Sequence, residues 1–241
     1  MALILNLETA TTVCSVSLGK DGELLALKEQ NGDYSHAENL TLFIEDVLKK
    51  ANVKISELDA IAVSKGPGSY TGLRIGVSTA KGLCYSLDKP LIAIDTLKHI
   101  ALAASQNFKS QISNPKSLFC PMLDARRMEV YCALFDSSLN YVRETAAEII
   151  DQSSFKLLFS PSEKAKEEYP VYFFGDGASK CKAVLSQNAN AFFIDDIFPS
   201  AKNMVSLSEK AFINKQFEDV AYFEPFYLKD FVAGKKKEKS S

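Results

Sequence analysis

The sequence predicts an α/β protein whose first half carries a mixed β-sheet. Two observations lead to this fold class. The first 30 or so residues read as a β-meander, and after them short apolar strands alternate with helical segments up to about residue 105. Strands that alternate with helices are typical of parallel pairing, and a meander adds antiparallel strands to the sheet. A chain of 241 residues, 46% of them hydrophobic, is long and apolar enough to bury a substantial core.

Three strands make up the predicted meander. Residues Ala2 to Leu7 are almost wholly apolar, which is typical of a strand covered on both faces. Residues Thr12 to Leu18 place alternate side chains on two faces, and Gly19 to Gly22 supplies turn chemistry. A returning strand is therefore expected from Glu23 to Lys28.

Helices and short strands are expected to alternate after the meander. Ser35 to Glu38 fits a capping box, which indicates the start of a first helix. Apolar residues then recur at helical spacing, at Leu40, Phe43, Ile44, Val47 and Leu48. The remaining elements are a buried strand at Ala60 to Val63, a second helix from Leu73 to Leu87, a strand at Leu91 to Ile94 and a third helix from Asp95 or Thr96 through Ser105.

A polar stretch from Gln106 to Ser117 marks the predicted domain boundary. A second cycle of elements follows it. Its members are strands at Leu118 to Leu123, Met128 to Phe135 and Val171 to Phe174, a glycine loop at Gly175 to Ala178, and a helix from Val205 to Gln216. The charged tail GKKKEKSS is expected to be disordered.

Composition restricts the cellular compartment of the protein and its capacity to bind RNA without a partner. Five scattered cysteines without a C-x-x-C pattern indicate free thiols in a reducing compartment. The first residues lack a basic segment, and no apolar run approaches the ~20 residues of a membrane span, so we expect a cytoplasmic protein with no membrane contact. A net charge of −2 indicates that any RNA is bound with the help of a more basic partner.

The run KGPGSYTGLRIG, from Lys65 to Gly76, admits two interpretations. It is not a Walker A loop, because Leu73 and Arg74 follow Gly72 where Lys and Ser or Thr are required. It also fails the dinucleotide pattern, which leaves a helix N-terminus able to hold an anion. Alternatively, the glycines bring two backbones close together.

Small residues recur every four positions along the second helix, at Gly72, Gly76 and Ala80. Such a stripe lets another element approach closely. The neighbour is either within the domain or on a partner protein, and spacing alone leaves both open.

Several stretches resemble the TsaB (YeaZ) family. KGPGSYTGLRIGVSTAKGL looks like the signature of that family, and ILNLETATTVCSVSL and SHAENLTLFIEDVL resemble its opening meander and first helix. LDARRMEVY resembles the start of its second domain, and FFGDGA its late glycine loop. PFYLKD resembles its near-terminal Tyr-Leu-Arg, with Lys229 in place of the arginine. These motifs run in family order from Ile4 to Lys229.

The resemblance implies the fold of the actin, sugar-kinase and Hsp70 superfamily, in which two ribonuclease-H-like domains pack together and the second is here abbreviated. The implied domains are an N-terminal one over residues 1–108 with partner-binding helices, a C-terminal one over 109–234, and a disordered tail over 235–241.

The resemblance also implies a role. The chain is expected to be a non-catalytic scaffold or activator of a TsaD-type transferase, which forms N6-threonylcarbamoyladenosine beside the tRNA anticodon. The implied partners are that transferase, a TsaE-type ATPase, tRNA indirectly through the complex, and a second copy of this chain when it is alone. The chain is expected to have no cofactor of its own. A possible site for ATP or ADP is the interface of the complex.

The resemblance further implies that the first two helices bind the partner or a second copy of the chain. The matching interface residues here are His36, Leu40, Phe43, Gly72, Arg74, Gly76, Thr79 and Ala80.

Catalytic members of the superfamily handle metal and phosphate with an aspartate after the first strand. In this chain Glu8 and Thr9 stand at that place, with no glycine beside them. Gly175, Asp176 and Gly177 stand where an adenosine-binding loop is expected. Together these five residues are candidates for a residual nucleotide site. For Gly175 to Gly177 the alternative is a tight structural turn.

Two further groups of residues are candidate sites. TsaD-like proteins hold a metal with an H-x-x-x-H pair, whereas His36 and His99 are far apart, so no metal site is expected and His36 is placed at the surface or interface. Asp124, Arg126 and Arg127 form an anion site, an interdomain salt bridge or a solvated turn.

Two alternative functions rest on analogy of fold, which does not carry function by itself. One is a stand-alone actin-like ATPase or kinase, which magnesium-dependent ATP turnover by the purified chain would favour. The other is a metallopeptidase-like protein, which would require stoichiometric zinc or iron.

Overall fold

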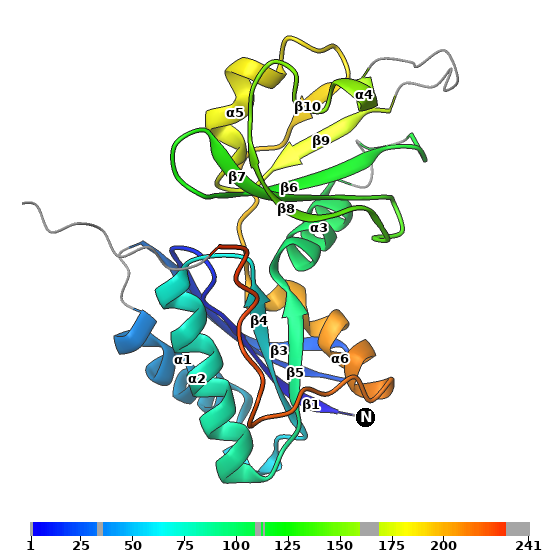
Figure 1. Cartoon of the computed structure of the whole chain (residues 1–241). Helices are drawn as coiled ribbons and strands as arrows, with labels where there is room; N and C mark the ends of the chain where they lie inside the picture. Colours follow the sequence, from blue (N-terminus) through cyan, green and yellow to red (C-terminus); the bar gives the residue numbers. More distant parts are fainter. Residues whose placement is uncertain (1, 33–35, 109–111, 113, 160–168, 230–241) are drawn as a thin grey trace, which may run out of the picture.

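The computed structural model describes residues 2–32, 36–108, 112, 114–159 and 169–229. Within them the strands form two five-stranded sheets, one from each half of the chain (Figure 1). Helices and strands alternate in both halves, so the predicted α/β class is confirmed. Ser35 of the predicted capping box and the tail 235–241 lie outside the described residues.

The first sheet is mixed, as predicted, and has the strand order β3-β2-β1-β4-β5. Its strands are β1 (Leu3–Glu8), β2 (Val13–Lys20), β3 (Glu23–Asn31), β4 (Ala60–Gly66) and β5 (Leu91–Asp95). The meander pairs antiparallel, β1 with β2 and β2 with β3, while β4 lies parallel to β1 and β5 parallel to β4.

The second sheet repeats this arrangement, with the order β10-β9-β6-β7-β8. Its strands are β6 (Leu118–Asp124), β7 (Glu129–Phe135), β8 (Tyr141–Ile149), β9 (Val171–Phe174) and β10 (Ala191–Phe193). Strands β6, β7 and β8 are antiparallel neighbours, and β9 and β10 add in parallel beside β6. Both halves therefore have the same topology although their sequences show no repeat.

Helices cover both faces of the first sheet (Figure 1). Helices α1 (His36–Ala51) and α2 (Tyr70–Leu87) lie on one face, and α6 (Val205–Ile213) lies on the other. In β1, Leu5 and Leu7 pack under α1 and α2, whereas Ile4 packs toward α6. Burial on both faces is the physical reason that Ala2 to Leu7 is almost wholly apolar, as predicted.

Each half supplies a helix to the sheet of the other half. Helix α3 (Thr96–Asn107) follows the first sheet, yet its Leu97 and Ile100 pack against Phe119 and Phe135 of the second sheet. Helix α6 follows the second sheet and packs against the first, together with a 3₁₀ turn at Ala201–Met204. The chain thus crosses twice between the two halves.

The helices of the second half are shorter than their counterparts. Helix α4 (Lys156–Phe159) has 4 residues and α5 (Ala178–Leu185) has 8, against 16 in α1 and 18 in α2. The expected abbreviation of the second domain therefore lies in its helices, because its sheet keeps five strands. The division at residues 108 and 109 stays a prediction.

Sequence analysis did not predict β8, α4, α5 or β10. Strand β8 is an edge strand with three charged residues, so it lacks the alternation of a half-buried strand. Helix α5 and strand β10 are short and give little periodic signal.

After α6 the chain returns across the first sheet in an irregular segment, residues 217–229, which we call the C-terminal strap (Figure 1, orange to red). The N–H of Glu218 donates to the carbonyl of Leu91 at 2.9 Å, and the N–H of Phe226 donates to that of Lys65 at 2.7 Å. At its end Lys229 forms an ion pair with Glu129 of β7. The strap therefore links the two sheets.

All five cysteines are free, as predicted, and all are buried. Of the helices in the described part of the chain, none has the length and apolar character needed to cross a membrane.

Candidate functional site

The glycine-rich loop joins β4 to α2 and caps the start of that helix. Ser69 is the N-cap residue, and its side chain accepts a hydrogen bond from the N–H of Gly72 at 3.3 Å. The N–H of Ser69 in turn donates to the carbonyl oxygen of Ala10 at 2.6 Å. The start of α2 is thereby tied to the turn between β1 and β2.

Three glycines approach that turn more closely than any other residue type could. A Cβ atom on Gly68 would overlap the carbonyl oxygen of Ala10. A Cβ atom on Gly72 would overlap the carbonyl oxygen of Thr9, and one on Gly76 would overlap its hydroxyl. The Thr9 hydroxyl donates to the carbonyl of Gly72 at 2.8 Å. The glycines thus serve the close approach of two backbone segments of the same chain.

The small-residue stripe is buried inside the chain, which corrects its interpretation as a partner-binding surface. Six of the eight predicted interface residues are buried: His36, Leu40, Phe43, Gly72, Gly76 and Ala80. The reason is that the β1–β2 turn fills the space beside the stripe. Arg74 is exposed and Thr79 is half-buried, and their contact with a partner stays a prediction.

His36 is also buried rather than exposed. Its Nε2 forms a hydrogen bond with the carbonyl oxygen of Thr11 at 2.7 Å. This histidine therefore fixes α1 to the β1–β2 turn.

A different face of α2 points outward. Arg74, Ser78, Gly82 and Tyr85 follow one another at spacings of four, four and three residues, and all are exposed. The side chain of Tyr85 is 87% exposed, and Leu42 on α1 is 57% exposed. A Cβ atom on Gly82 would have no heavy atom within 4 Å. The sequence signal for this face was Gly82, a helical glycine outside the buried stripe.

The C-terminal strap covers one side of α2. The guanidinium of Arg74 lies 4.1 Å from the ring centroid of Tyr70, and its Nε donates to the hydroxyl of Tyr227 at 3.3 Å. The Lys81 ammonium donates to two strap carbonyl oxygens at 3.1 and 3.0 Å. Part of the α2 surface is therefore already occupied by the chain's own strap.

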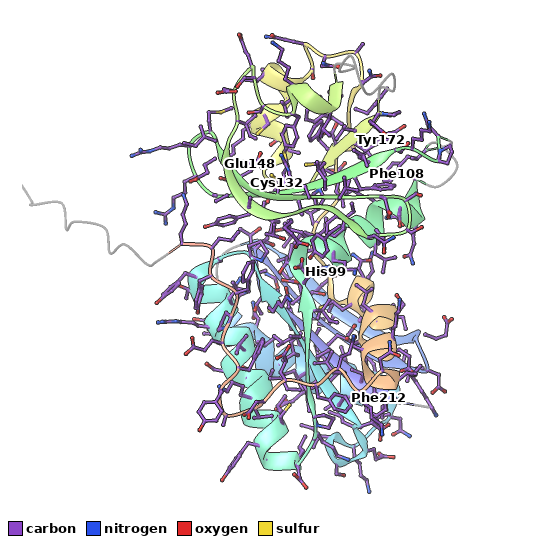
Figure 2. The ribbon with its side chains drawn as sticks, turned by 45° about the vertical axis from the view of Figure 1, so that its right-hand side comes forward. His99, Phe108, Cys132, Glu148, Tyr172 and Phe212 are labelled. Carbon is purple, nitrogen blue, oxygen red and sulfur yellow. The ribbon has the colours of Figure 1, made fainter. Side chains whose placement is uncertain are left out.

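Glu8, the candidate acid after the first strand, is paired with His99. Its Oε2 lies 2.6 Å from Nε2 of His99, and neither side chain is exposed. Its Oε1 accepts the N–H of Ala10 at 2.5 Å. Figure 2 places His99, from α3, at the junction of the two halves of the molecule. Burial, and secondarily the Glu8 charge, raises the pKa of the nearby Cys14 thiol to about 11.

The late glycine loop is bound to the end of β6. Gly175 has φ +99°, and a Cβ atom there would overlap the carbonyl oxygen of Met122. The N–H of Gly177 donates to the same carbonyl at 3.0 Å. Asp176 accepts the N–H of Asp124 at 3.0 Å, and burial raises the pKa of its carboxyl group. Both candidate nucleotide-binding segments, Glu8 with Thr9 and the late glycine loop, thus form hydrogen bonds within their own half of the chain. Nucleotide binding at either segment stays a prediction.

No group of three or more His, Cys, Asp or Glu side chains gathers as a metal site in the described ranges. Asp124, one of the candidate anion-site residues, pairs with Lys180 of α5 at 2.6 Å. That ion pair lies within the second half of the chain.

Two copies of one sheet topology, with a helix of each half covering the other sheet, define the class of this protein. It has the two ribonuclease-H-like domains of the actin-like ATPase superfamily, with the acid after its first strand held by its own chain.

Comparison with known proteins gives the family. Residues 30–237 match the family model described as "TsaD: tRNA N6-adenosine threonylcarbamoyltransferase". The chain is 27% identical to "tRNA threonylcarbamoyladenosine biosynthesis protein TsaB" of Escherichia coli (strain K12) over 97% of each chain. The protein of that name from Bacillus subtilis (strain 168) is 29% identical over 94% of this chain and 93% of its own.

A solved structure, "YeaZ from Pseudomonas aeruginosa", superimposes with a TM-score of 0.76 at 25% identity, over 95% of this chain and all of that one. A tRNA N6-adenosine threonylcarbamoyltransferase of Staphylococcus haemolyticus (strain JCSC1435) is 36% identical, but over 41% of this chain and 33% of its own. The chain therefore belongs to the threonylcarbamoyltransferase family of that model and is one of its TsaB (YeaZ) members.

Proposed function

We propose that this chain is a non-catalytic scaffold and activator of a TsaD-type transferase in the formation of N6-threonylcarbamoyladenosine in tRNA. The observation that carries the proposal is the match to a TsaB biosynthesis protein over 97% of both chains. The transferase relative of Staphylococcus haemolyticus, by contrast, matches over less than half of either chain.

The state of Glu8 supports a partner subunit rather than an enzyme. Both carboxylate oxygens are already used, one by His99 and one by the N–H of Ala10, and the side chain is fully buried. A carboxylate that handles metal or phosphate needs an oxygen directed at the ligand. Glu8 instead joins the β1–β2 turn to α3.

The partner-binding surface in this proposal is the outward face of α1 and α2. It offers Leu42 and Tyr85 as exposed apolar anchors, with Ser78 and Gly82 between Arg74 and Tyr85 allowing a close approach. A second copy of the chain uses the same face when the transferase is absent, since a two-fold dimer presents one patch to itself. A TsaE-type ATPase and a nucleotide join at the complex, which forms in the cytoplasm.

The experiment that tests the function has two parts. Light scattering coupled to size-exclusion chromatography is run on this chain alone and with the TsaD-type protein of the same organism, and tRNA modification is assayed with each component omitted in turn. We expect a dimer that exchanges for a heterocomplex, and modification only when both proteins are present. A chain that ignores the transferase, or that by itself turns over ATP with magnesium, contradicts the proposal.

A pair of variants at Gly82 tests the surface. Gly82→Arg places a long charged side chain on the open face of α2, so we expect an intact fold and loss of the heterocomplex. Gly82→Ala, the matched control, should preserve both. Normal assembly by Gly82→Arg would show that the transferase binds elsewhere.

A further inference from the structure

The turn between β6 and β7 holds two consecutive arginines in the left-handed backbone conformation. The φ angle is +72° at Arg126 and +48° at Arg127. Among the described residues no other two adjacent non-glycine residues both have positive φ. Left-handed backbone is unfavourable for residues that carry a Cβ atom, and hairpin turns that need it favour Gly, Asn or Asp. Stability of the turn therefore does not explain the choice of arginine at either position.

The turn is nonetheless well defined by hydrogen bonds. The Asp124 carboxylate accepts the N–H of Arg126 at 2.6 Å. The N–H of Ala125 donates to the carbonyl of Glu129, and the N–H of Glu129 donates to that of Arg126, both at 3.1 Å. These bonds fix where the two arginine side chains leave the backbone.

The acidic side chains beside the turn already have partners. Asp124 pairs with Lys180 at 2.6 Å, and Glu129 pairs with Lys229 of the C-terminal strap. Asp176 is half-buried, and its carboxylate accepts the backbone N–H of Asp124. The local acids are therefore not available to neutralise the two arginines.

Arg126 and Arg127 are exposed, and within the described ranges their guanidinium groups have neither an ion pair nor a hydrogen bond. Among the described residues, the structure therefore does not support an interdomain salt bridge made by these arginines. Two unneutralised guanidinium groups on a fixed, unfavourable turn are suited to an anion supplied by another molecule.

We propose that Arg126 and Arg127 bind backbone phosphates of the tRNA held by the transferase complex. This inference rests on the proposed function and goes beyond it, because it makes the contact of this chain with tRNA direct. The planar guanidinium donates two parallel hydrogen bonds to a phosphate, which lysine cannot do. With a net charge of −2 the chain adds a local contact and the complex supplies most of the affinity.

The test compares three variants in the assembled complex. Arg126→Gly with Arg127→Gly removes both charges at positions where glycine is favoured. Arg126→Lys with Arg127→Lys keeps the charges but loses the bidentate geometry. The matched control is Lys215→Gly at the end of α6, where an exposed lysine has φ +54°, because it relieves the same kind of backbone without touching the proposed site.

Three quantities are measured for each: thermal stability, assembly with the transferase, and tRNA affinity as a function of salt. We expect both glycine variants to be at least as stable as the natural chain, and all variants to assemble. The double glycine variant should lose affinity by roughly 5- to 10-fold, and its log–log salt slope should fall by about 1.5, since each phosphate contact contributes ~0.7 to 0.9. The double lysine variant should keep most of the slope, and Lys215→Gly should bind normally.

Unchanged tRNA affinity and salt slope in a normally assembled double glycine complex would overturn this inference while leaving the proposed function intact. Loss of assembly by that variant would overturn it too, since the arginines would then bind an acidic protein surface. A second variant is truncated after Gly234 and so lacks the tail lysines. If this truncation removes the whole contribution of the chain to the salt slope, the inference also fails. Failure of the natural chain to assemble would instead refute the proposed function.

Discussion

Nε2 of His99 lies 2.6 Å from Oε2 of Glu8, and both side chains are completely buried. The pair joins the end of β1 to α3, the helix that the first half of the chain contributes to the second sheet. Glu8, which sequence analysis considers as part of a residual nucleotide site, thus acts here as part of the junction between the two sheets.

Glu8→Ala should therefore destabilise the protein. It leaves His99 and the Ala10 N–H without their acceptor, and breaking a buried pair in this way costs about 3 kcal/mol. Urea unfolding of the variant gives this value. Glu8→Gln, which keeps the shape and one acceptor oxygen, should lose less. A Glu8→Gln protein of full stability whose complex no longer modifies tRNA would indicate a chemical role for Glu8 instead.

Alanine at two glycines of α2 should change stability in opposite directions. At Gly76 a Cβ atom would overlap the Thr9 hydroxyl, so Gly76→Ala should cost about 1 to 3 kcal/mol. At Gly82 the space is open, and Gly82→Ala should stabilise the helix by roughly 0.5 to 1 kcal/mol. The midpoints of urea unfolding of the two variants and the natural chain measure these changes in stability. A Gly76→Ala protein as stable as the natural one would return the stripe to the list of partner surfaces.

The buried cysteines should make stability fall in alkaline solution. Burial raises the pKa of the Cys84 thiol from 9.0 to about 12, and burial with the Glu8 charge raises that of Cys14 to about 11. Above pH 9 the unfolded chain loses these protons while the folded chain keeps them, so deprotonation favours the unfolded state. The contribution is fully present below pH 9 and is lost as the pH rises from 9 toward 12.

Urea unfolding at a series of pH values between 7 and 11 measures this effect. Cys84→Ala is the control, and its stability should depend less steeply on pH above 9. An identical pH profile in the two proteins would show that Cys84 ionises equally easily in both states.

Removing the ammonium of Lys81 should loosen the C-terminal strap without unfolding the protein. Lys81→Met keeps the aliphatic stem but deletes two hydrogen bonds to strap carbonyls, each worth about 1 kcal/mol. The amide N–H of Phe226 donates to the backbone carbonyl of Lys65, and its hydrogen exchange should become several-fold faster. Lys50→Met on α1 is the matched control, since its ammonium binds the carbonyl of Leu27 away from the strap. Equal exchange in the two variants would mean that other contacts hold the strap.

The candidate site was only partly predictable from sequence. The glycine spacing correctly indicated a close backbone approach at the start of α2. It could not say what approaches, because Thr9 and Ala10 lie more than 55 residues earlier in the chain than the glycines that they meet. The stripe was consequently assigned to a partner, and the outward face with Ser78, Gly82 and Tyr85 was missed.

The same limit applies to Glu8 and His99, which are 91 residues apart. Sequence analysis treats them separately, Glu8 as part of a possible nucleotide site and His99 as a histidine too far from His36 in the sequence to share a metal. Spacing within a helix predicts neighbours three or four residues away, and it carries no information on side chains brought together by two sheets.

The sequence by itself determined the α/β class, the mixed first sheet and the end of α2 at Leu87, because hydrophobic period and turn chemistry act over a few residues. The helix begins at Tyr70, three residues before the predicted Leu73. The motifs in their order determined the family. Only the tertiary structure decided that α3 and α6 cover each other's sheets, that the small stripe is buried and that the strap occupies one side of α2. Those outcomes follow from which apolar faces meet when the whole chain is packed, and that is a property of long-range contacts.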